Sequence, residues 1–199
     1  MSQFYTNLNN FDLISQLQNG EIGIIPTDTV YGMVCLAKNQ QSVERIYFVR
    51  QRDKGKALII LIDSIDKIAD FKINLTSSQK SLLNKIWPGP LTVLLPHEGN
   101  PKFDYIYGDS QYLSFRVPAF EDLKNLLNRV GPLVAPSANL QGLAPAISID
   151  EAQAYFGDKV DFYLDSGKLD NLPSTVAILQ GESFELVRAG GFDISKFDK

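Results

Sequence analysis

Short apolar runs alternate along the chain with segments in which apolar residues recur at helical spacing. The runs are too short for globular helices and have the length of buried strands. We therefore predict strands over residues 22–25, 33–37, 57–62, 91–95, 113–117, 133–135, 162–164, 175–179 and 184–187. Two pairs of these strands are joined by short links, which favours antiparallel contacts near residues 24 and 34 and near residues 176 and 186.

Helical spacing and end signals place helices between the predicted strands. Phe11, Ile14 and Leu17 share one helix face, and Asn19-Gly20 is a typical stop. Further helices are predicted from residue 39 or 42, from the capping box at 76–79, around 123–127, and after the Ser-x-x-Glu cap at 148–151. The pattern predicts a single α/β domain over residues 7–191, with a large, twisted, open mixed sheet and flanking helices. Residues 100–110 are expected to form an irregular, mobile loop.

The composition is that of an ordinary globular protein: of 199 residues, 44% are hydrophobic and 21% are charged. The net charge of −4 argues against a protein whose whole surface binds nucleic acid. No apolar stretch approaches the ~20 residues of a membrane helix, and no membrane partner is expected. The single cysteine, Cys35, is expected to be a buried thiol, and the cytoplasm is the expected compartment. The single histidine, His97, excludes a multi-histidine metal site and is expected in an exposed loop.

A polar segment, Pro26-Thr-Asp-Thr-Val-Tyr-Gly32, separates the first two predicted strands. Its hydroxyls, carboxylate and phenol follow a buried strand, where polar groups need partners from the protein or from a ligand. One interpretation is a structural turn, in which Pro fixes φ, Asp and Thr bond nearby amides, and Gly closes the turn. The other interpretation is one wall of a binding site, and the local sequence leaves both open.

Four cations, Arg50, Arg52, Lys54 and Lys56, occupy alternate positions after a predicted helix. If this segment is extended, a period of two places all four on one side. Arginine forks and lysine charges suit phosphate or carboxylate groups. A solvated loop is an equally good interpretation, because most segments rich in charged residues lie in contact with solvent.

Two further segments carry polar groups at the ends of predicted strands. Arg116 alternates with apolar neighbours, so it shares a strand face with Ser114 and is either solvent-facing or held to receive a carboxylate. Ser137 and Asn139 follow another strand and enter a tight turn, where they either cap the turn or bond a nucleotide.

Several enzyme signatures are missing from the sequence. It contains no Gly-x4-Gly-Lys-Ser/Thr phosphate loop, no Gly-x-Gly-x-x-Gly fingerprint and no Gly-x-Ser-x-Gly elbow. Metal-ligand spacing is also missing. These features argue against a standard NTPase, dehydrogenase, serine hydrolase or zinc enzyme.

Six motifs, in order along the chain, resemble the YrdC-like domain of the threonylcarbamoyl-AMP synthase family, in its short TsaC form. They are Pro-Thr-Asp-Thr-Val-Tyr-Gly, Arg-Gln-Arg, Trp-Pro-Gly-Pro-Leu-Thr, Phe-Arg-Val-Pro, Ala-Pro-Ser-Ala-Asn-Leu-x-Gly and Ser-Thr-Val, and the resemblance runs from about residue 11 to residue 190. It implies a twisted open α/β sheet with a positively charged concave face. It also implies the condensation of L-threonine, bicarbonate and ATP into L-threonylcarbamoyladenylate, with release of pyrophosphate.

The resemblance implies a role for ten side chains, and none of these roles is covalent. Arg116 is implied to hold the substrate carboxylate and Tyr31 to shape the pocket floor. The residues implied to bind threonine are Thr27, Tyr31, Lys56, Arg116 and Ser174. The residues implied to bind ATP are Arg50, Arg52, Ser137, Asn139 and Arg188.

Two of the positions with an implied role depart from the family pattern. Arg50 stands where the family usually has Lys, which keeps the charge but replaces a point charge with a bulkier fork. Lys56 stands where some members have a substrate-contacting His. Within the turn, Asp28 and Thr29 are expected only to hold the local backbone.

The resemblance also sets expectations for cofactors and partners. Mg²⁺ is expected to arrive with ATP rather than on protein ligands. The downstream partners are proteins that transfer the threonylcarbamoyl group to tRNA, and tRNA itself is a further candidate. Two alternatives stay open: a module that binds double-stranded RNA or tRNA through the cation cluster, and a YrdC-like paralogue with another substrate. The acidic net charge weighs against the RNA-binding module.

Overall fold

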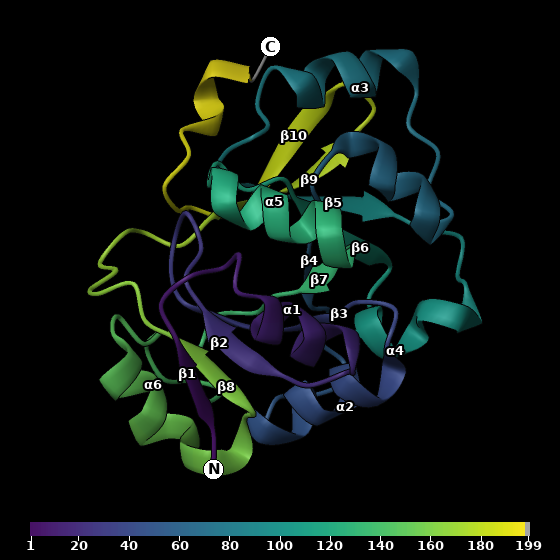
Figure 1. Cartoon of the computed structure of the whole chain (residues 1–199). Helices are drawn as coiled ribbons and strands as arrows, with labels where there is room; N and C mark the ends of the chain where they lie inside the picture. The colour runs from purple at the N-terminus through teal and green to yellow at the C-terminus, as the bar shows by residue number, and fades with distance from the viewer. Residues whose placement is uncertain (198–199) are drawn as a thin grey trace.

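Ten strands form one continuous mixed sheet in the computed structural model, which describes residues 1–197 (Figure 1). The strand order is β1-β8-β2-β3-β7-β4-β6-β5-β9-β10. The strands are β1 (Gln3–Tyr5), β2 (Gly23–Ile25), β3 (Gly32–Leu36), β4 (Ile59–Leu61), β5 (Leu91–Pro96), β6 (Tyr112–Arg116), β7 (Leu133–Val134), β8 (Phe162–Leu164), β9 (Thr175–Gln180) and β10 (Ser183–Arg188). The predicted α/β domain with a large mixed sheet is confirmed.

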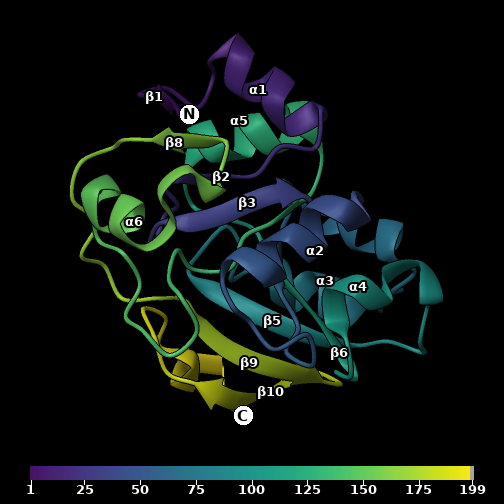
Figure 2. The same ribbon diagram turned by 90° about the horizontal axis from the view of Figure 1, so that it is seen from below.

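Helices cover both faces of the sheet (Figure 2). Residues of α1 and α5 pack into one hydrophobic core, and residues of α2, α3 and α6 pack into the other. Along β2, Ile24 joins one core and Ile25 joins the other, as the period of two in a strand requires. The helices are α1 (Phe11–Gln18), α2 (Gln40–Val49), α3 (Ser77–Asn84), α4 (Asp104–Tyr107), α5 (Glu121–Val130) and α6 (Ile149–Phe156), with 3-10 turns η1 (Ile65–Phe71), η2 (Pro101–Phe103), η3 (Gly157–Lys159) and η4 (Ile194–Phe197).

The predicted helix starts are confirmed by their caps. Asn39 accepts a hydrogen bond from the backbone of α2, and Ser148 accepts one from the backbone of α6. Thr76 and Gln79 form the predicted capping box of α3, in which each side chain bonds the other residue's backbone N–H. Within residues 1–197, no helix combines the length and the apolar character needed to cross a membrane.

The pairing of the strands places the polar segment 26–31 against the middle of the sheet. β2 pairs antiparallel with β3, and β9 with β10, as their short links predict. β4 pairs parallel with β6, and β5 with β9, so the sheet is mixed. The segment 26–31 therefore links two central strands, beside the ends of β6 and β7.

The edge strand β1 and the segment 100–110 differ from the prediction. β1 pairs parallel with β8 at the edge of the sheet, and its three residues are too few to give an alternating pattern. The segment 100–110 is not irregular, because it contains η2 and α4 and buries Phe103, Ile106 and Tyr107. These apolar residues have helical spacing but span a single turn, which is too short to be distinguished from a loop.

The single cysteine and the single histidine both lie against other parts of the fold. Cys35 is buried on β3 as predicted, and its burial raises the pKa of the thiol. His97 is half-buried rather than exposed, with its ring 3.9 Å from that of Tyr107. Its Nε2 lies 3.0 Å from the Ser110 carbonyl, so tertiary contacts that are not visible in the local sequence hold it.

Candidate active site

One pocket of about 340 Å³ gathers residues from widely separated parts of the chain. Nine of the ten side chains with a role implied by the sequence line it: Thr27, Tyr31, Arg50, Arg52, Arg116, Ser137, Asn139, Ser174 and Arg188. The tenth, Lys56, is exposed and lies outside the lining. The sequence motifs therefore converge on one place in the fold, with that one exception.

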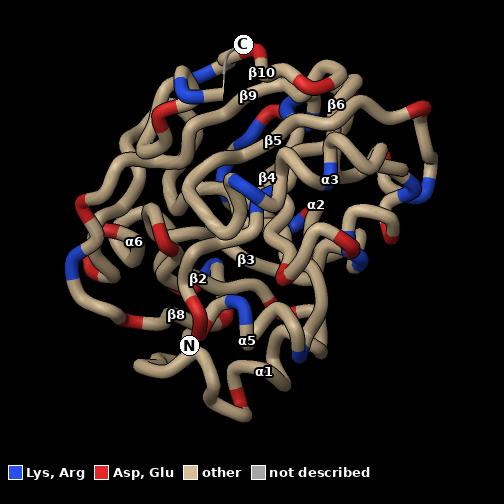
Figure 3. Tube along the Cα trace, turned by 90° about the horizontal axis from the view of Figure 1, so that it is seen from above, with Lys and Arg blue, Asp and Glu red and all other residues tan. Residues whose placement is uncertain are grey.

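The lining residues lie at the ends of helices and strands. Arg50 caps the C-terminus of α2, Arg116 ends β6, and Arg188 ends β10. Ser137 lies just beyond β7 and Ser174 just before β9. In the trace of charged positions, several Lys and Arg residues lie near β4 and β5, in the middle of the molecule (Figure 3).

Thr27 holds the turn between β2 and β3. Its Oγ1 donates to the Val30 carbonyl (2.7 Å) and accepts from the backbone N–H groups of Thr29 (3.1 Å) and Val30 (3.3 Å). A hydroxyl has one proton to donate and two lone pairs to accept with, so these three bonds use its full capacity, and a ligand that bonds Thr27 Oγ1 must displace one of them. Asp28 was expected to hold the turn, but its side chain bonds outside the turn instead.

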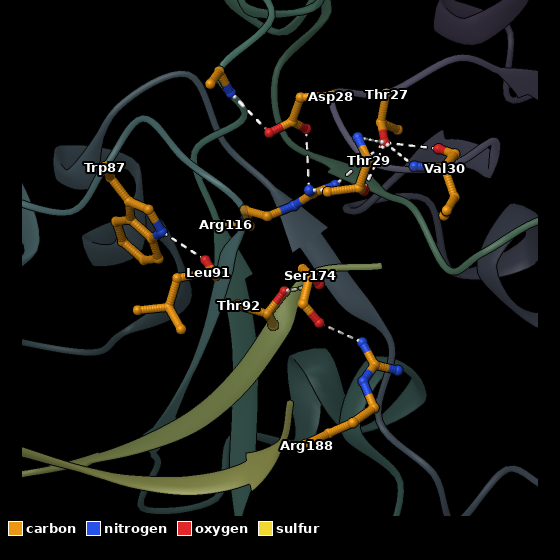
Figure 4. Close-up of polar contacts among 11 residues, drawn as sticks. Thr27, Asp28, Thr29, Val30, Trp87, Leu91, Thr92, Arg116, Ser174 and Arg188 are labelled. Carbon is orange, nitrogen blue, oxygen red and sulfur yellow. Dashed lines mark hydrogen bonds and ion pairs between the residues drawn. The ribbon is translucent and has the colours of Figure 1, made fainter. Parts of the chain in front are cut away.

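Arg116 is buried behind this turn, with 4% of its surface exposed. Its Nη1 donates to Thr29 Oγ1 (3.0 Å) and lies 3.0 Å from Asp28 Oδ1, while its Nη2 makes a longer bond to Thr27 Oγ1 (3.5 Å; Figure 4). Burial lowers the pKa of Arg116, and the Asp28 carboxylate opposes this effect. The residue implied to hold a substrate carboxylate thus has a carboxylate partner within the protein.

Arg50 is hydrogen-bonded to the turn that contains Asn139. Its Nε donates to the Asn139 main-chain carbonyl and its Nη2 to Asn139 Oδ1, both at 3.1 Å. Arg50 is 2% exposed, and its Nη1 has no hydrogen-bond partner among residues 1–197. Burial, and then the charge of Arg52, lowers the pKa of Arg50 to about 10, so the guanidinium is charged at neutral pH. A buried guanidinium with an unused donor is suited to an anion.

The turn after β7 is locked by its own side chains. Ser137 Oγ donates to Asn139 Oδ1 (2.6 Å), and Asn139 Nδ2 donates to the carbonyls of Leu140 (2.8 Å) and Leu143 (2.9 Å). Ser137 also forms a β-bridge with Gly32, at the start of β3. The turn is therefore fixed both internally and against the Thr27 segment.

The cation-rich segment after α2 is not extended, so the condition under which its four cations would share one side is not met. Gln51 has a φ of +51°, which turns the chain at the end of the helix. Arg52 is half-buried, and its Nε (3.3 Å) and Nη2 (3.0 Å) donate to the carbonyls of residues 56 and 57. Arg50 and Arg52 line the pocket, whereas Lys54 and Lys56 are exposed on the surface.

Ser174 is held between two strands. Its Oγ lies 2.8 Å from Thr92 Oγ1 on β5, and its carbonyl accepts from Arg188 Nη2 at 2.8 Å (Figure 4). The register of β9 and β10 shifts just before Arg188, and such a bulge redirects the side chain that follows it. Beyond Arg188 the chain packs so closely that a Cβ at Gly190 would overlap the Pro173 carbonyl.

Tyr31 anchors the connection between β8 and β9 beside the pocket. Its phenol donates to the Gly167 carbonyl (2.7 Å) and accepts from the Ser166 backbone N–H (3.0 Å). Burial raises the pKa of Tyr31, so the phenol is neutral and able to donate at ordinary pH. Tyr31 thus lines the pocket and ties it to this connection.

The pocket combines four guanidinium groups with neutral hydroxyl and amide groups. Such a set suits a ligand that carries several negative charges, and it can position groups for a reaction without a protein nucleophile. Among residues 1–197, no cluster of three or more His, Cys, Asp and Glu side chains could hold a metal ion.

Residues 15–190 match the Sua5/YciO/YrdC family, whose description is telomere recombination. The chain belongs to this family. A threonylcarbamoyl-AMP synthase of Pseudoalteromonas atlantica is 33% identical over 174 residues, which cover 85% of this chain and 90% of that relative. A putative threonylcarbamoyl-AMP synthase of Methanocaldococcus jannaschii is 30% identical over 186 residues, which cover 92% of this chain and 86% of the relative.

Solved structures of the Sua5/YciO/YrdC family share the fold. Sua5 of P. abyssi complexed with L-threonine superposes with a TM-score of 0.86 at 28% identity, over 98% of this chain. The present chain spans 59% of the length of that Sua5 chain. E. coli YciO superposes with a TM-score of 0.85 at 22% identity, over 99% of this chain and 100% of YciO, which shows the fold alone.

Sequence reasoning missed three residues of this family member's site. Thr29, which was expected only to hold the turn, and Gln141, which had no expected role, both line the pocket. Gln141 occupies the variable position of the Asn-Leu-x-Gly motif. Its side chain accepts from the Asp53 backbone N–H at 2.8 Å, which ties two walls together. Thr92 is fully buried and supports Ser174, and its place in the Trp-Pro-Gly-Pro-Leu-Thr motif was the signal that could have found it.

Proposed function

We propose that this protein is a threonylcarbamoyl-AMP synthase, which condenses L-threonine, bicarbonate and ATP into L-threonylcarbamoyladenylate and pyrophosphate. The observation that carries the proposal is the gathering of nine of the ten side chains with an implied role, four of them arginines, around one pocket. The names of the relatives that match most of the chain, and the threonine-bound Sua5 structure, support the same reaction.

The two sides of the pocket suit the two larger substrates. Arg116, with the hydroxyls of Thr27 and Ser174 nearby in the lining, is proposed to hold threonine by its carboxylate. Arg50, Arg52 and Arg188, with Ser137 and Asn139, are proposed to hold ATP. Lys56 is outside the lining, so its implied contact with threonine has no support from the geometry.

The proposed reaction needs positioning and charge stabilisation rather than a protein nucleophile. The neutral amine of threonine forms a bond to the carbon of bicarbonate, and water leaves to give a carbamate. A carbamate oxygen then bonds to the α-phosphorus of ATP as the bond to the bridging oxygen of the β-phosphate breaks. Pyrophosphate carries away that electron pair, and guanidinium groups offset its charge. A pocket with rigid walls also limits attack by water on the labile product.

The remaining participants follow from the chemistry. Mg²⁺ is proposed to enter as the ATP complex and to neutralise phosphate charge. Proteins that pass the threonylcarbamoyl group to tRNA are the proposed downstream partners, because the mixed anhydride is short-lived in water. Direct tRNA binding is the second candidate activity, and the test below separates it from the synthase reaction.

The test is to incubate the protein with ATP, Mg²⁺, bicarbonate and each amino acid in turn, without RNA, and to measure pyrophosphate. We expect release that depends on threonine and bicarbonate. Arg116→Gln should abolish it. Arg45→Gln, which removes an arginine from an ion pair outside the pocket, should leave it within about twofold of wild type.

Failure of the proposal would take a definite form. Pyrophosphate release that no amino acid stimulates would refute the synthase reaction. The same result together with salt-sensitive binding of double-stranded RNA would favour the RNA-binding module instead. Release stimulated by another amino acid would identify a paralogue with a different substrate.

A further inference from the structure

Asp28 lies next to the pocket without lining it. Its Oδ1 lies 3.0 Å from Arg116 Nη1, and its Oδ2 accepts from the Ala119 backbone N–H at 3.0 Å. The side chains of Arg116 and Asp28 are 4% and 7% exposed. Burial of an ion pair carries a large desolvation cost, and the pair often contributes little net stability. The position of this pair beside the pocket therefore calls for a functional explanation.

The internal contacts of Arg116 are concentrated on one part of its guanidinium. Nη1 faces both Asp28 and Thr29, whereas Nε has no partner among residues 1–197 and Nη2 has a single long bond. Nε and Nη2 together form one edge of the arginine fork, the edge that suits a bidentate carboxylate. Asp28 Oδ1 has no hydrogen-bond partner among residues 1–197, so its contact with Nη1 is an ion pair without a hydrogen bond. Asp28 thus offsets the charge of the guanidinium from one side and leaves the donors of the other edge little used.

Asp28 also makes the charge of the pocket uneven, because it pairs with only one of the four arginines that line it. Among residues 1–197, Arg116 is paired with a carboxylate, whereas Arg50, Arg52 and Arg188 form no ion pair. The Arg116–Asp28 pair at one end is therefore close to neutral, and the end with Arg50 and Arg52 carries uncompensated positive charge. Burial lowers the pKa of Arg116, and Arg188 lies close enough for its charge to lower it further. A zwitterionic amino acid has no net charge and matches the first end, whereas a polyphosphate matches the second.

We propose that Asp28 is a positioning residue that neutralises and orients Arg116, so that this end of the pocket accepts an amino-acid carboxylate and rejects phosphate. The proposal rests on the proposed function for the identity of the amino acid. Its core statement, that Asp28 keeps inorganic anions away from Arg116, does not depend on the substrate.

A purely structural role for Asp28 predicts a different effect of its replacement from the role proposed above. If Asp28 only ties the turn to Ala119 and Arg116, its loss lowers stability and activity without creating affinity for anions. If it neutralises Arg116, then Asp28→Asn leaves a buried cation that an inorganic anion can pair with. Asn preserves the shape and can still accept the Ala119 bond, so the substitution isolates the charge.

The test uses sulfate as the probe and thermal unfolding as the first readout. Sulfate stabilises most folded proteins, so the control is Asp70→Asn, which removes a carboxylate from the exposed ion pair with Lys38. At sulfate ten times its dissociation constant, we expect Asp28→Asn to gain about 3–5 °C in melting temperature beyond the gain of the control. This readout needs no substrate, so it stands even if the proposed reaction fails.

Kinetics supply the second readout. In Asp28→Asn, sulfate should compete with threonine and raise its KM by about tenfold, while any effect of sulfate on the KM for ATP should be the same within about twofold in Asp28→Asn, Asp70→Asn and wild type. In wild type and Asp70→Asn, sulfate should not compete with threonine. Asp28→Glu, which keeps the charge, should restore the resistance to sulfate.

Each outcome decides the proposal. A folded Asp28→Asn protein that gains no more from sulfate than the control overturns it. If Asp28→Asn folds only with sulfate, the anion has replaced the carboxylate and the proposal stands. If sulfate does not rescue folding but the double variant Asp28→Asn/Arg116→Gln folds, then Arg116 is inaccessible to anions and the proposal fails.

Discussion

Replacing Arg50 with the lysine that is usual in the family tests whether this guanidinium holds the Asn139 turn. Arg50 makes two hydrogen bonds to Asn139, one to the main-chain carbonyl and one to the side-chain oxygen, both at 3.1 Å. The Nε and Nη2 donors lie along one rigid edge and reach both oxygens at once. An ammonium is a single point, so a lysine that reaches one of these oxygens leaves the other without its partner.

The magnitude follows from the loss of one buried, charge-assisted hydrogen bond. Such a bond contributes about 1.5–3 kcal/mol, so we expect Arg50→Lys to lower the free energy of unfolding by about 2 kcal/mol. Denaturant unfolding measures this change. The matched control is Arg52→Lys, in the same segment, where a half-buried guanidinium bonds two main-chain carbonyls and the expected loss is below about 1 kcal/mol.

A double-mutant cycle with Asn139→Ala isolates the contact between the two side chains. The cycle should give a coupling energy of about 1–2 kcal/mol, because these residues touch. ATP affinity should fall in Arg50→Lys as well, since Ser137 and Asn139 lose their support. An unfolding free energy within about 0.5 kcal/mol of wild type, together with coupling near zero, would refute the positioning role of Arg50.

Two further predictions concern residues outside the nucleotide wall. Lys56→Ala should change the KM for threonine by less than about twofold, because the ammonium is exposed outside the pocket, and a tenfold rise measured by pyrophosphate release would restore its implied role. Burial raises the pKa of Tyr47 from 10.0 to about 12, so the folded state favours the neutral phenol, and this contribution is complete below pH 10 and lost as pH rises toward 12. The difference in unfolding free energy between wild type and Tyr47→Phe should therefore shrink between pH 10 and 12, and a constant difference would contradict the assignment.

The sequence identified the segments of the site because each has a strong local signal. A polar turn between buried strands, an arginine alternating with apolar residues and a Ser-x-Asn turn after a strand are all unusual in a core. Their positions at the ends of adjacent strands then bring them to one pocket. The central strands could be predicted for a similar reason, because their apolar runs are long enough to be recognised as buried strands.

The errors arise where tertiary contacts or backbone turns outweigh the local pattern. The alternation of four cations from Arg50 to Lys56 is real, but a left-handed residue at Gln51 ends the helix and breaks the period. The short helix α4 buries too few residues to stand out from a loop. The pairing of Asp28 with Arg116 joins distant segments, so no local pattern could show it.

Main-chain hydrogen bonds between the walls explain why these distant motifs form one rigid site. The Ala138 N–H donates to the Tyr31 carbonyl (2.8 Å), and the Gln141 N–H donates to the Arg50 carbonyl (3.0 Å). Both bonds lie within the protein and need no ligand, so these walls of the pocket are set before a substrate binds. A substitution that shifts one wall therefore also shifts the wall bonded to it. For this reason we expect Arg50→Lys to lower both the free energy of unfolding and the affinity for ATP.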